Sequence, residues 1–171
     1  MDHSEQKVKI LGATAVDAKL RRIAYEIYER SFGREEIVII GIGKRGGYVA
    51  DRLEGMLAEV APLKVLRLAA VKAAEGDGIT LDGDDVAGTI QGRLALVVDD
   101  VLYSGRTMFH ALAAVMEHGP EMVQTAVLID RGHRNLPVTH DYVGMVLATS
   151  LKQYVSVEIA ENEKKAVAYV F

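Results

Sequence analysis

The sequence predicts an α/β fold, a single domain with a doubly wound, mainly parallel sheet that is flanked by helices and carries a flexible loop. Short β-branched runs alternate with segments of helical periodicity, as expected of successive βαβ units. The chain has 171 residues, which suits one domain, and half of them are hydrophobic, enough to fill a core. No repeat, low-complexity tract or linker interrupts the pattern, so we expect one domain over residues 1–171.

The first half of the chain predicts helices and strands in alternation. Residues 15–30 place apolar side chains at helical spacing, and the pair 32–33, Phe-Gly, ends that pattern. Residues 37–42 form a β-branched run typical of a buried strand. A glycine-rich loop at 43–47, a helix over 48–59 and a strand over 63–71 follow.

The second half continues the alternation after an irregular segment. Residues 72–92 are rich in glycine and acidic side chains without a clear period, which predicts a mobile loop with a short hairpin. Residues 94–98 have the composition of a buried strand, and helical spacing begins at Met108 and ends before the pair 119–120, Gly-Pro. Further strands are expected over 126–129, 142–149, 155–159 and 166–170.

The most informative stretch covers residues 94–107. Its apolar strand is followed by two adjacent carboxylates, Asp99 and Asp100, which we call the acid pair. Such a pair is costly to bury unless hydroxyls or a cation bind it. The small and hydroxylated residues that follow lead into a helix N-terminus, whose N–H groups favour an anion. Together these features predict a clamp for ribose 5-phosphate, rather than a polar strand end with a helix cap.

Two other polar loops are expected at the same edge of the sheet, because ligands of such sheets bind beyond the carboxyl ends of the strands. Residues 43–47 place Lys44 and Arg45 among three glycines, a composition that suits a polyphosphate. The alternative is a strand-to-helix turn with solvated charges. Residues 130–134 form the other loop.

Several segments resemble known families. Residues 97–107, Val-Val-Asp-Asp-Val-Leu-Tyr-Ser-Gly-Arg-Thr, resemble the diphosphoribosyl-binding signature of type I phosphoribosyltransferases. Residues 128–137 and 141–144 resemble the bacterial pyrimidine operon regulator family, whose members are also uracil phosphoribosyltransferases. The resemblance covers residues 11–158 approximately.

The resemblance implies roles for individual residues. The acid pair is expected at the ribose 2′ and 3′ hydroxyls, directly or through Mg²⁺, and with Arg45 it forms the catalytic set. Lys44, Arg45 and Gly46 are expected at the pyrophosphate. The remaining substrate contacts are expected from Val101, Leu102, Tyr103, Ser104, Gly105, Arg106 and Thr107 around the 5-phosphate, and from Asp130 and Arg131 near the base.

The implied reaction transfers ribose 5-phosphate from phosphoribosyl diphosphate to a nucleobase, with uracil as the favoured acceptor and pyrophosphate as the leaving group. The alternative is a nucleotide-sensing regulator of pyrimidine genes that binds RNA and has weak or no catalysis. The resemblance offers five RNA contacts, although three of them would equally suit a solvated helix face. The five are Arg21, Arg22 and Arg30, on that helix face, with His133 and Arg134.

The chain departs from the regulator family at four places. The family's closing loop carries a Thr-Leu-Tyr-Arg-Asp-Asp type segment, whereas residues 69–78 here offer Lys72 as their only cation. The basic charge of the pyrophosphate loop is shifted by one position. Met145 and Thr139 stand where the family has a lysine and an arginine. The enzyme and the regulator therefore both remain open.

The amino-acid composition excludes or disfavours several classes of function. The net charge of −4 disfavours non-specific nucleic-acid binding as the main role. The chain has no cysteine, which excludes disulfides, thiolate metal sites and cysteine nucleophiles. Its first residues are polar and no apolar run approaches membrane length, so we expect a cytoplasmic protein without a membrane partner. The resemblance implies a homodimer or a higher assembly.

Overall fold

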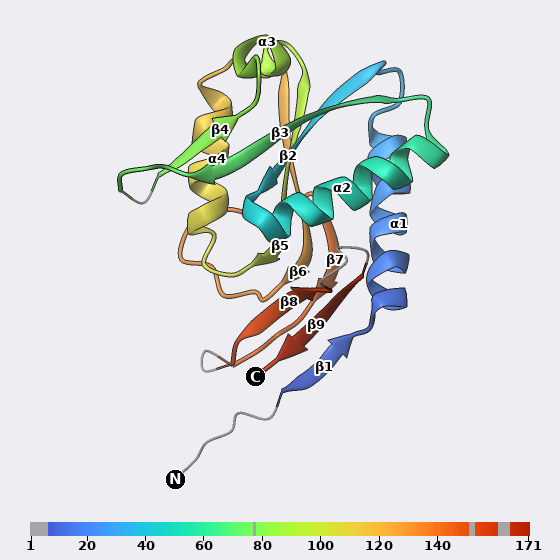
Figure 1. Ribbon diagram of the computed structural model, residues 1–171, viewed down its shortest axis with the longest axis vertical. Coiled ribbons are helices and arrows are strands. Elements are labelled where there is room, and N and C mark those ends of the chain that lie inside the picture. The colour runs from blue at the N-terminus through green and yellow to red at the C-terminus, as the bar shows by residue number, and fades with distance from the viewer. Residues whose placement is uncertain (1–6, 77, 151–152, 161–164) are drawn as a thin grey trace.

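A computed structural model describes residues 7–76, 78–150, 153–160 and 165–171 of the chain. Its main sheet has six strands in the order β4-β3-β2-β5-β6-β7, and every pairing except β3 with β4 is parallel (Figure 1). The doubly wound, mainly parallel sheet expected from the sequence is therefore confirmed. Its strands are β2 (Glu36–Ile42), β3 (Lys64–Lys72), β4 (Ile79–Asp82), β5 (Leu94–Leu102), β6 (Met122–Asp130) and β7 (Tyr142–Val146).

Helices cover both faces of this sheet. The side chains of β2 alternate between two separate cores, with Ile37 and Ile39 on one face and Val38 and Ile40 on the other. The β-branched run is continuous because both of its faces are buried. Helices α1 (Ala13–Arg30) and α2 (Gly43–Val60) pack on the first face, and α4 (Arg106–Met116) packs on the second.

The sheet has its switch point between β2 and β5. The chain leaves β2 through α2 toward β3, and leaves β5 through α4 toward β6, so the two helices lie on opposite faces. A crevice opens at such a point beyond the carboxyl ends of the two strands. The acid pair and the glycine-rich segment 43–47 both lie there.

A second, antiparallel sheet has the order β1-β9-β8 and lies below the main sheet in Figure 1. Strands were expected at 155–159 and 166–170, and both form there. They pair with each other and with a strand near the N-terminus instead of lengthening the parallel sheet. The strands are β1 (Val8–Leu11), β8 (Val155–Ile159) and β9 (Ala166–Val170).

Several boundaries differ from the expected ones. β6 begins at Met122 instead of residue 126, and β7 ends at Val146 instead of residue 149. Residues 43–47 were expected to be a loop, but they form the first turn of α2. The backbone of this turn lies directly against β2 and β5. The acid pair was expected to follow its strand, but β5 continues through it to Leu102. The hairpin within residues 72–92 is confirmed, since β4 pairs antiparallel with β3, while the short helix α3 (Val86–Ile90) was not predicted. No helix in the described ranges is long and apolar enough to cross a membrane.

Candidate functional site

The first turn of α2 lies in close contact with the end of β5. A Cβ atom on Gly46 would approach the Val98 carbonyl oxygen to 2.7 Å and Oδ1 of Asp99 to 3.2 Å. Atoms that are not bonded cannot come so close without displacement, so only glycine fits at this position. This contact places the neighbouring Arg45 close enough to the acid pair for its charge to act on Asp99.

The acid pair is incompletely hydrogen-bonded, with Asp100 buried and Asp99 half-buried. Asp100 is 8% exposed, and its Oδ2 atom has no hydrogen-bond partner among the described residues. Oδ1 of Asp99 accepts a 2.9 Å hydrogen bond from the backbone N–H of Asp100. Burial raises the pKa of Asp99 well above its usual range, the charge of Asp100 raises it further, and Arg45 opposes both. Hydroxyl donors or a cation beside the pair would offset this cost.

A tight loop at residues 103–107, which we call the phosphate loop, joins β5 to α4. Gly105 has a φ angle of +82°, and the backbone N–H of Arg106 points to Oγ of Ser104 at 3.3 Å. The loop encloses a cavity of about 150 Å³ that is lined by Asp99 and residues 101–108. A cavity at a helix N-terminus with a carboxylate on its far wall suits a molecule with a phosphate at one end and hydroxyls at the other.

Two unpaired arginines lie in or beside this crevice. The side chains of Arg45 and Arg106 make no hydrogen bond or ion pair with any described residue, and both are exposed. Every other arginine of the chain donates to a carboxylate or another oxygen of the protein. Lys44 lines an adjoining cavity of about 310 Å³, opposite Ile159 of β8. Arg45 and Arg106 are therefore the two arginines of the chain that are available to an anionic ligand in this region.

The Asp130 side chain is held by the protein itself. Its carboxylate is buried and accepts from the backbone N–H of Gly132 at 2.8 Å and from the Arg134 guanidinium, and Nε2 of His140 lies 3.0 Å away. The loop after β6 is thereby fixed. The expected role of Asp130 near a base stays a prediction.

Arg131 is also buried, and it connects the phosphate loop to the segment before β8. Its guanidinium lies 4.1 Å from the ring centre of Tyr103 and donates to Oγ1 of Thr149 at 3.1 Å and to the Gln153 carbonyl. Sequence reasoning did not find Thr149 and Gln153, because no motif links them to a position 18 and 22 residues earlier. A base role for Arg131 stays a prediction too.

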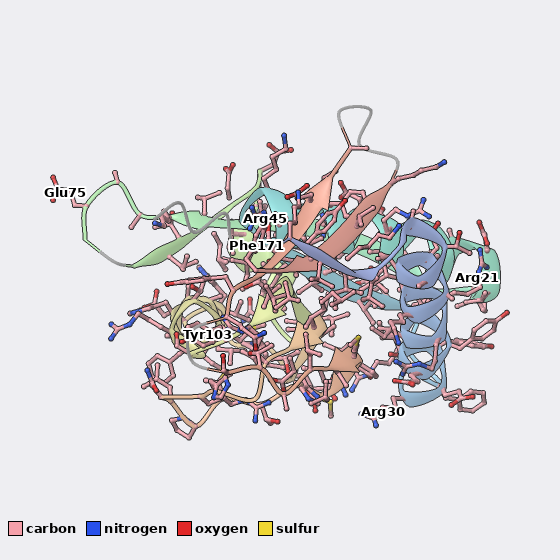
Figure 2. The ribbon with its side chains drawn as sticks, turned by 90° about the horizontal axis from the view of Figure 1, so that it is seen from below. Arg21, Arg30, Arg45, Glu75, Tyr103 and Phe171 are labelled. Atoms are coloured by element: carbon pink, nitrogen blue, oxygen red, sulfur yellow. The ribbon has the colours of Figure 1, made fainter. Side chains whose placement is uncertain are left out.

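The proposed RNA contacts fall into two groups. Three lie on α1, whereas His133 and Arg134 belong to the loop after β6, where the His133 ring lies edge-on to Tyr103 of the phosphate loop at 6.4 Å. Figure 2 shows Arg21 and Arg30 along α1, on the opposite side of the view from Tyr103 of the phosphate loop. All five residues are engaged within the chain. Their partners are Glu59 for Arg21, the carbonyls of Val143 and Gly144 for Arg22, the Asp141 carbonyl for Arg30, the Thr149 carbonyl for His133, and Asp130 for Arg134.

Comparisons with known proteins agree with this geometry. The family model described as the phosphoribosyl transferase domain matches residues 9–161. A protein named bifunctional protein PyrR from Clostridium acetobutylicum is 40% identical over 168 residues, which cover 90% of each chain. Another of that name from Streptomyces coelicolor is 39% identical over 176 residues, covering 95% of this chain and 88% of that protein.

Solved structures share the fold. A hypoxanthine-guanine phosphoribosyltransferase from Bacillus anthracis matches 96% of this chain and 98% of its own, with a TM-score of 0.73 and 24% identity. The hypoxanthine phosphoribosyltransferase of Trypanosoma cruzi matches 94% and 95%, with a TM-score of 0.74 and 16% identity. At these identities the likeness concerns the fold.

Proposed function

The chain belongs to the phosphoribosyl transferase domain family, and we propose that it transfers ribose 5-phosphate from phosphoribosyl diphosphate to uracil. The observation that carries the proposal is the acid pair at the switch point. Asp99 lines the cavity of the phosphate loop, and the adjacent Asp100 has a buried carboxylate oxygen without a partner among the described residues. Uracil is favoured over purines because residues 128–137 and 141–144 resemble the pyrimidine operon regulator family rather than the purine enzymes.

In the proposed reaction, the bond between C1′ and the diphosphate oxygen breaks and the diphosphate leaves with the electron pair. A base nitrogen forms the new bond to C1′ and loses its proton. The phosphate loop holds the 5-phosphate through backbone N–H groups, and Arg45 faces the charge that develops on the leaving diphosphate. Catalysis then consists of positioning and electrostatic stabilisation.

The acid pair also suits a magnesium ion. Two adjacent carboxylates, one with a buried unpartnered oxygen, can supply part of an octahedral oxygen shell, and the substrate and water can supply the rest. No group of three or more metal-binding side chains occurs in the described part of the chain, so substrate oxygens would have to complete the shell. Mg²⁺ held by Asp99 and Asp100 would neutralise charge on the diphosphate.

The proposal is tested by incubating the protein with phosphoribosyl diphosphate, Mg²⁺ and a panel of pyrimidines and purines. We expect pyrophosphate release with uracil to exceed that with every purine. Pyrophosphate release with a purine alone would identify a purine as the acceptor base and would still support the transferase function. Silence with all bases, while phosphoribosyl diphosphate still binds tightly, would show that the crevice only holds the ligand.

A second candidate function is nucleotide-dependent RNA binding, which the name bifunctional of the PyrR relatives favours. All five proposed RNA contacts have partners within the chain, so RNA would have to use their remaining N–H donors or displace those partners. The test measures affinity for an RNA hairpin at low salt, where phosphate contacts are strongest, with and without uridine monophosphate. A nucleotide-dependent affinity supports this function, and absence of binding at low salt removes it.

A further inference from the structure

A second basic cavity lies on the outer side of the phosphate loop. It has a volume of about 180 Å³ and lies between the β3–β4 hairpin and helix α4, lined by Lys72, Gly76, Ile79, Arg106, Thr107 and His110. It shares only Arg106 and Thr107 with the cavity inside the loop, so these two residues separate the cavities. We propose that this outer cavity binds a phosphate group.

The fold brings three basic side chains to this cavity from two elements. Lys72 is the last residue of β3 and pairs with Ile79, the first residue of β4. Arg106 and His110 are four positions apart in α4 and therefore project from one face of that helix. The hairpin supplies one cation and the helix supplies two basic groups.

None of these three basic groups is neutralised within the described chain. Lys72, Arg106 and His110 have no side-chain hydrogen bond or ion pair there, and none of the lining residues is acidic. Lys64, at the other end of the same strand, lies 3.5 Å from a Glu36 carboxylate oxygen. Figure 2 shows Glu75 at the outer tip of the hairpin, away from α4. An anion would supply the missing partner.

The size of the cavity limits the ligand to a small group. Pockets that enclose drug-sized molecules have volumes of about 300–1,000 Å³, whereas this cavity measures about 180 Å³. It therefore accommodates a phosphate group and not a whole nucleotide. The phosphate can come from free inorganic phosphate or from a nucleotide whose remainder lies outside. Neither case depends on the proposed transferase activity.

The experiment follows the ring signals of His110 by NMR during titration with inorganic phosphate at constant ionic strength. The His110→Gln variant identifies the signals. We expect a saturable shift, and we expect Lys72→Gln to weaken the apparent affinity about tenfold, because it removes a charge-assisted hydrogen bond. Lys64→Gln, a matched change on the same strand, should leave the affinity unchanged. A shift that does not saturate, or equal affinities for Lys72→Gln and the parent, would overturn the proposal.

A second titration tests whether the outer cavity binds phosphate independently of the cavity inside the phosphate loop. The titration is repeated with ribose 5-phosphate saturating the inner cavity, and the His110 shift should persist. Its disappearance would mean that the two cavities form one site and would overturn the proposal. Uridine monophosphate then replaces inorganic phosphate. A similar shift identifies a nucleotide source, and a shift with inorganic phosphate alone identifies the free anion. Failure of ribose 5-phosphate to bind would count against the transferase and leave the His110 readout intact.

Discussion

At the scale of single residues, the absence of one side chain sets how closely α2 approaches the acid pair. Gly46 and Gly47 are neighbours in the first turn of the helix, yet their surroundings differ. A Cβ on Gly46 would collide with the β5 backbone, whereas a Cβ on Gly47 would have no atom within 4 Å. Substituting each glycine in turn therefore distinguishes the effect of a steric contact with β5 from the effect of helix propensity.

We expect Gly46→Ala to destabilise the protein by roughly 1–3 kcal/mol through overpacking, and to lower transferase activity by moving Arg45 away from the acid pair. Gly47→Ala should leave stability unchanged or raise it by about 0.5–1 kcal/mol, because alanine favours a helix. Urea unfolding and steady-state kinetics on both variants check the prediction. Equal losses of stability in the two variants would contradict it.

A second prediction at this scale concerns Asp100. Asparagine keeps the shape of the side chain but removes the negative charge, so Asp100→Asn should fold with unchanged or slightly higher stability, since the buried oxygen is unpartnered. The kcat/KM should fall by about 100-fold if the carboxylate stabilises charge in the transition state. Asp82→Asn, an exposed change on the hairpin, is the control. An unaltered kcat/KM for Asp100→Asn would exclude this role.

At the scale of elements, Arg131 joins the phosphate loop to the segment that precedes β8. Lysine cannot stack flat on Tyr103 and donate at the same time to Thr149 and the Gln153 carbonyl. We expect Arg131→Lys to cost about 2 kcal/mol of unfolding free energy, as for a lost hydrogen bond from a charged group. Arg134→Lys should cost less, because a single ion pair with Asp130 tolerates a point charge. A smaller effect at Arg131 than at Arg134 would refute this account.

The packing of α1 on β7 gives a prediction about pH. Burial raises the pKa of the Tyr142 hydroxyl, the charge of Asp141 adds to it, and Arg30 opposes it. The folded-state pKa of Tyr142 therefore lies above the unfolded value of about 10. The stabilisation by the neutral hydroxyl is complete below about pH 10 and is lost as the pH rises through the folded-state pKa. Tyr142→Phe lacks the hydrogen bond to Gln124, so it should start less stable at pH 8.

The measurement compares urea midpoints of the parent and Tyr142→Phe between pH 8 and pH 11. The parent should lose stability more steeply over the upper part of this range, so the two curves should converge. Tyr48, whose pKa burial also raises, is present in both proteins and contributes equally. Parallel curves would show that Tyr142 does not titrate differently in the folded and unfolded states.

At the scale of the whole molecule, local patterns predict the main sheet and two strands of the second sheet, but they predict neither β1 nor the pairing of the second sheet. Each strand from β2 to β7 that carries an uninterrupted apolar run was expected from that run alone. The pairing of β1 with β9 brings Val8 opposite Val170, 162 positions later, and no short-range pattern specifies such a contact. The sequence also failed to predict that α2 begins at Gly43. Its glycines are typical of a loop, and the reason for Gly46, its close contact with β5, depends on the tertiary structure.

The candidate site also has one part that the sequence predicts and another that it does not. The acid pair and the phosphate loop are contiguous in the sequence, so their residues alone predicted a common cavity, and the structure places Asp99 and residues 101–108 around one. The partners of Arg131 and the approach of Lys72 to His110 depend on how separate elements meet. These contacts become visible only when the tertiary structure is known.

The pairing of β1 with β9 has a consequence for biosynthesis. β1 leaves the ribosome before its partner, which follows 162 positions later, and at about 5–20 residues per second this is a delay of roughly 8–32 s. During this interval the nascent chain can assemble much of the parallel sheet, while β1 has no partner strand. Ile159, which faces Lys44 across its cavity, belongs to the sheet that closes last. Translation products that stop before β9 lack the strand that pairs with β8, so Ile159 is held in this wall only after β9 has been made.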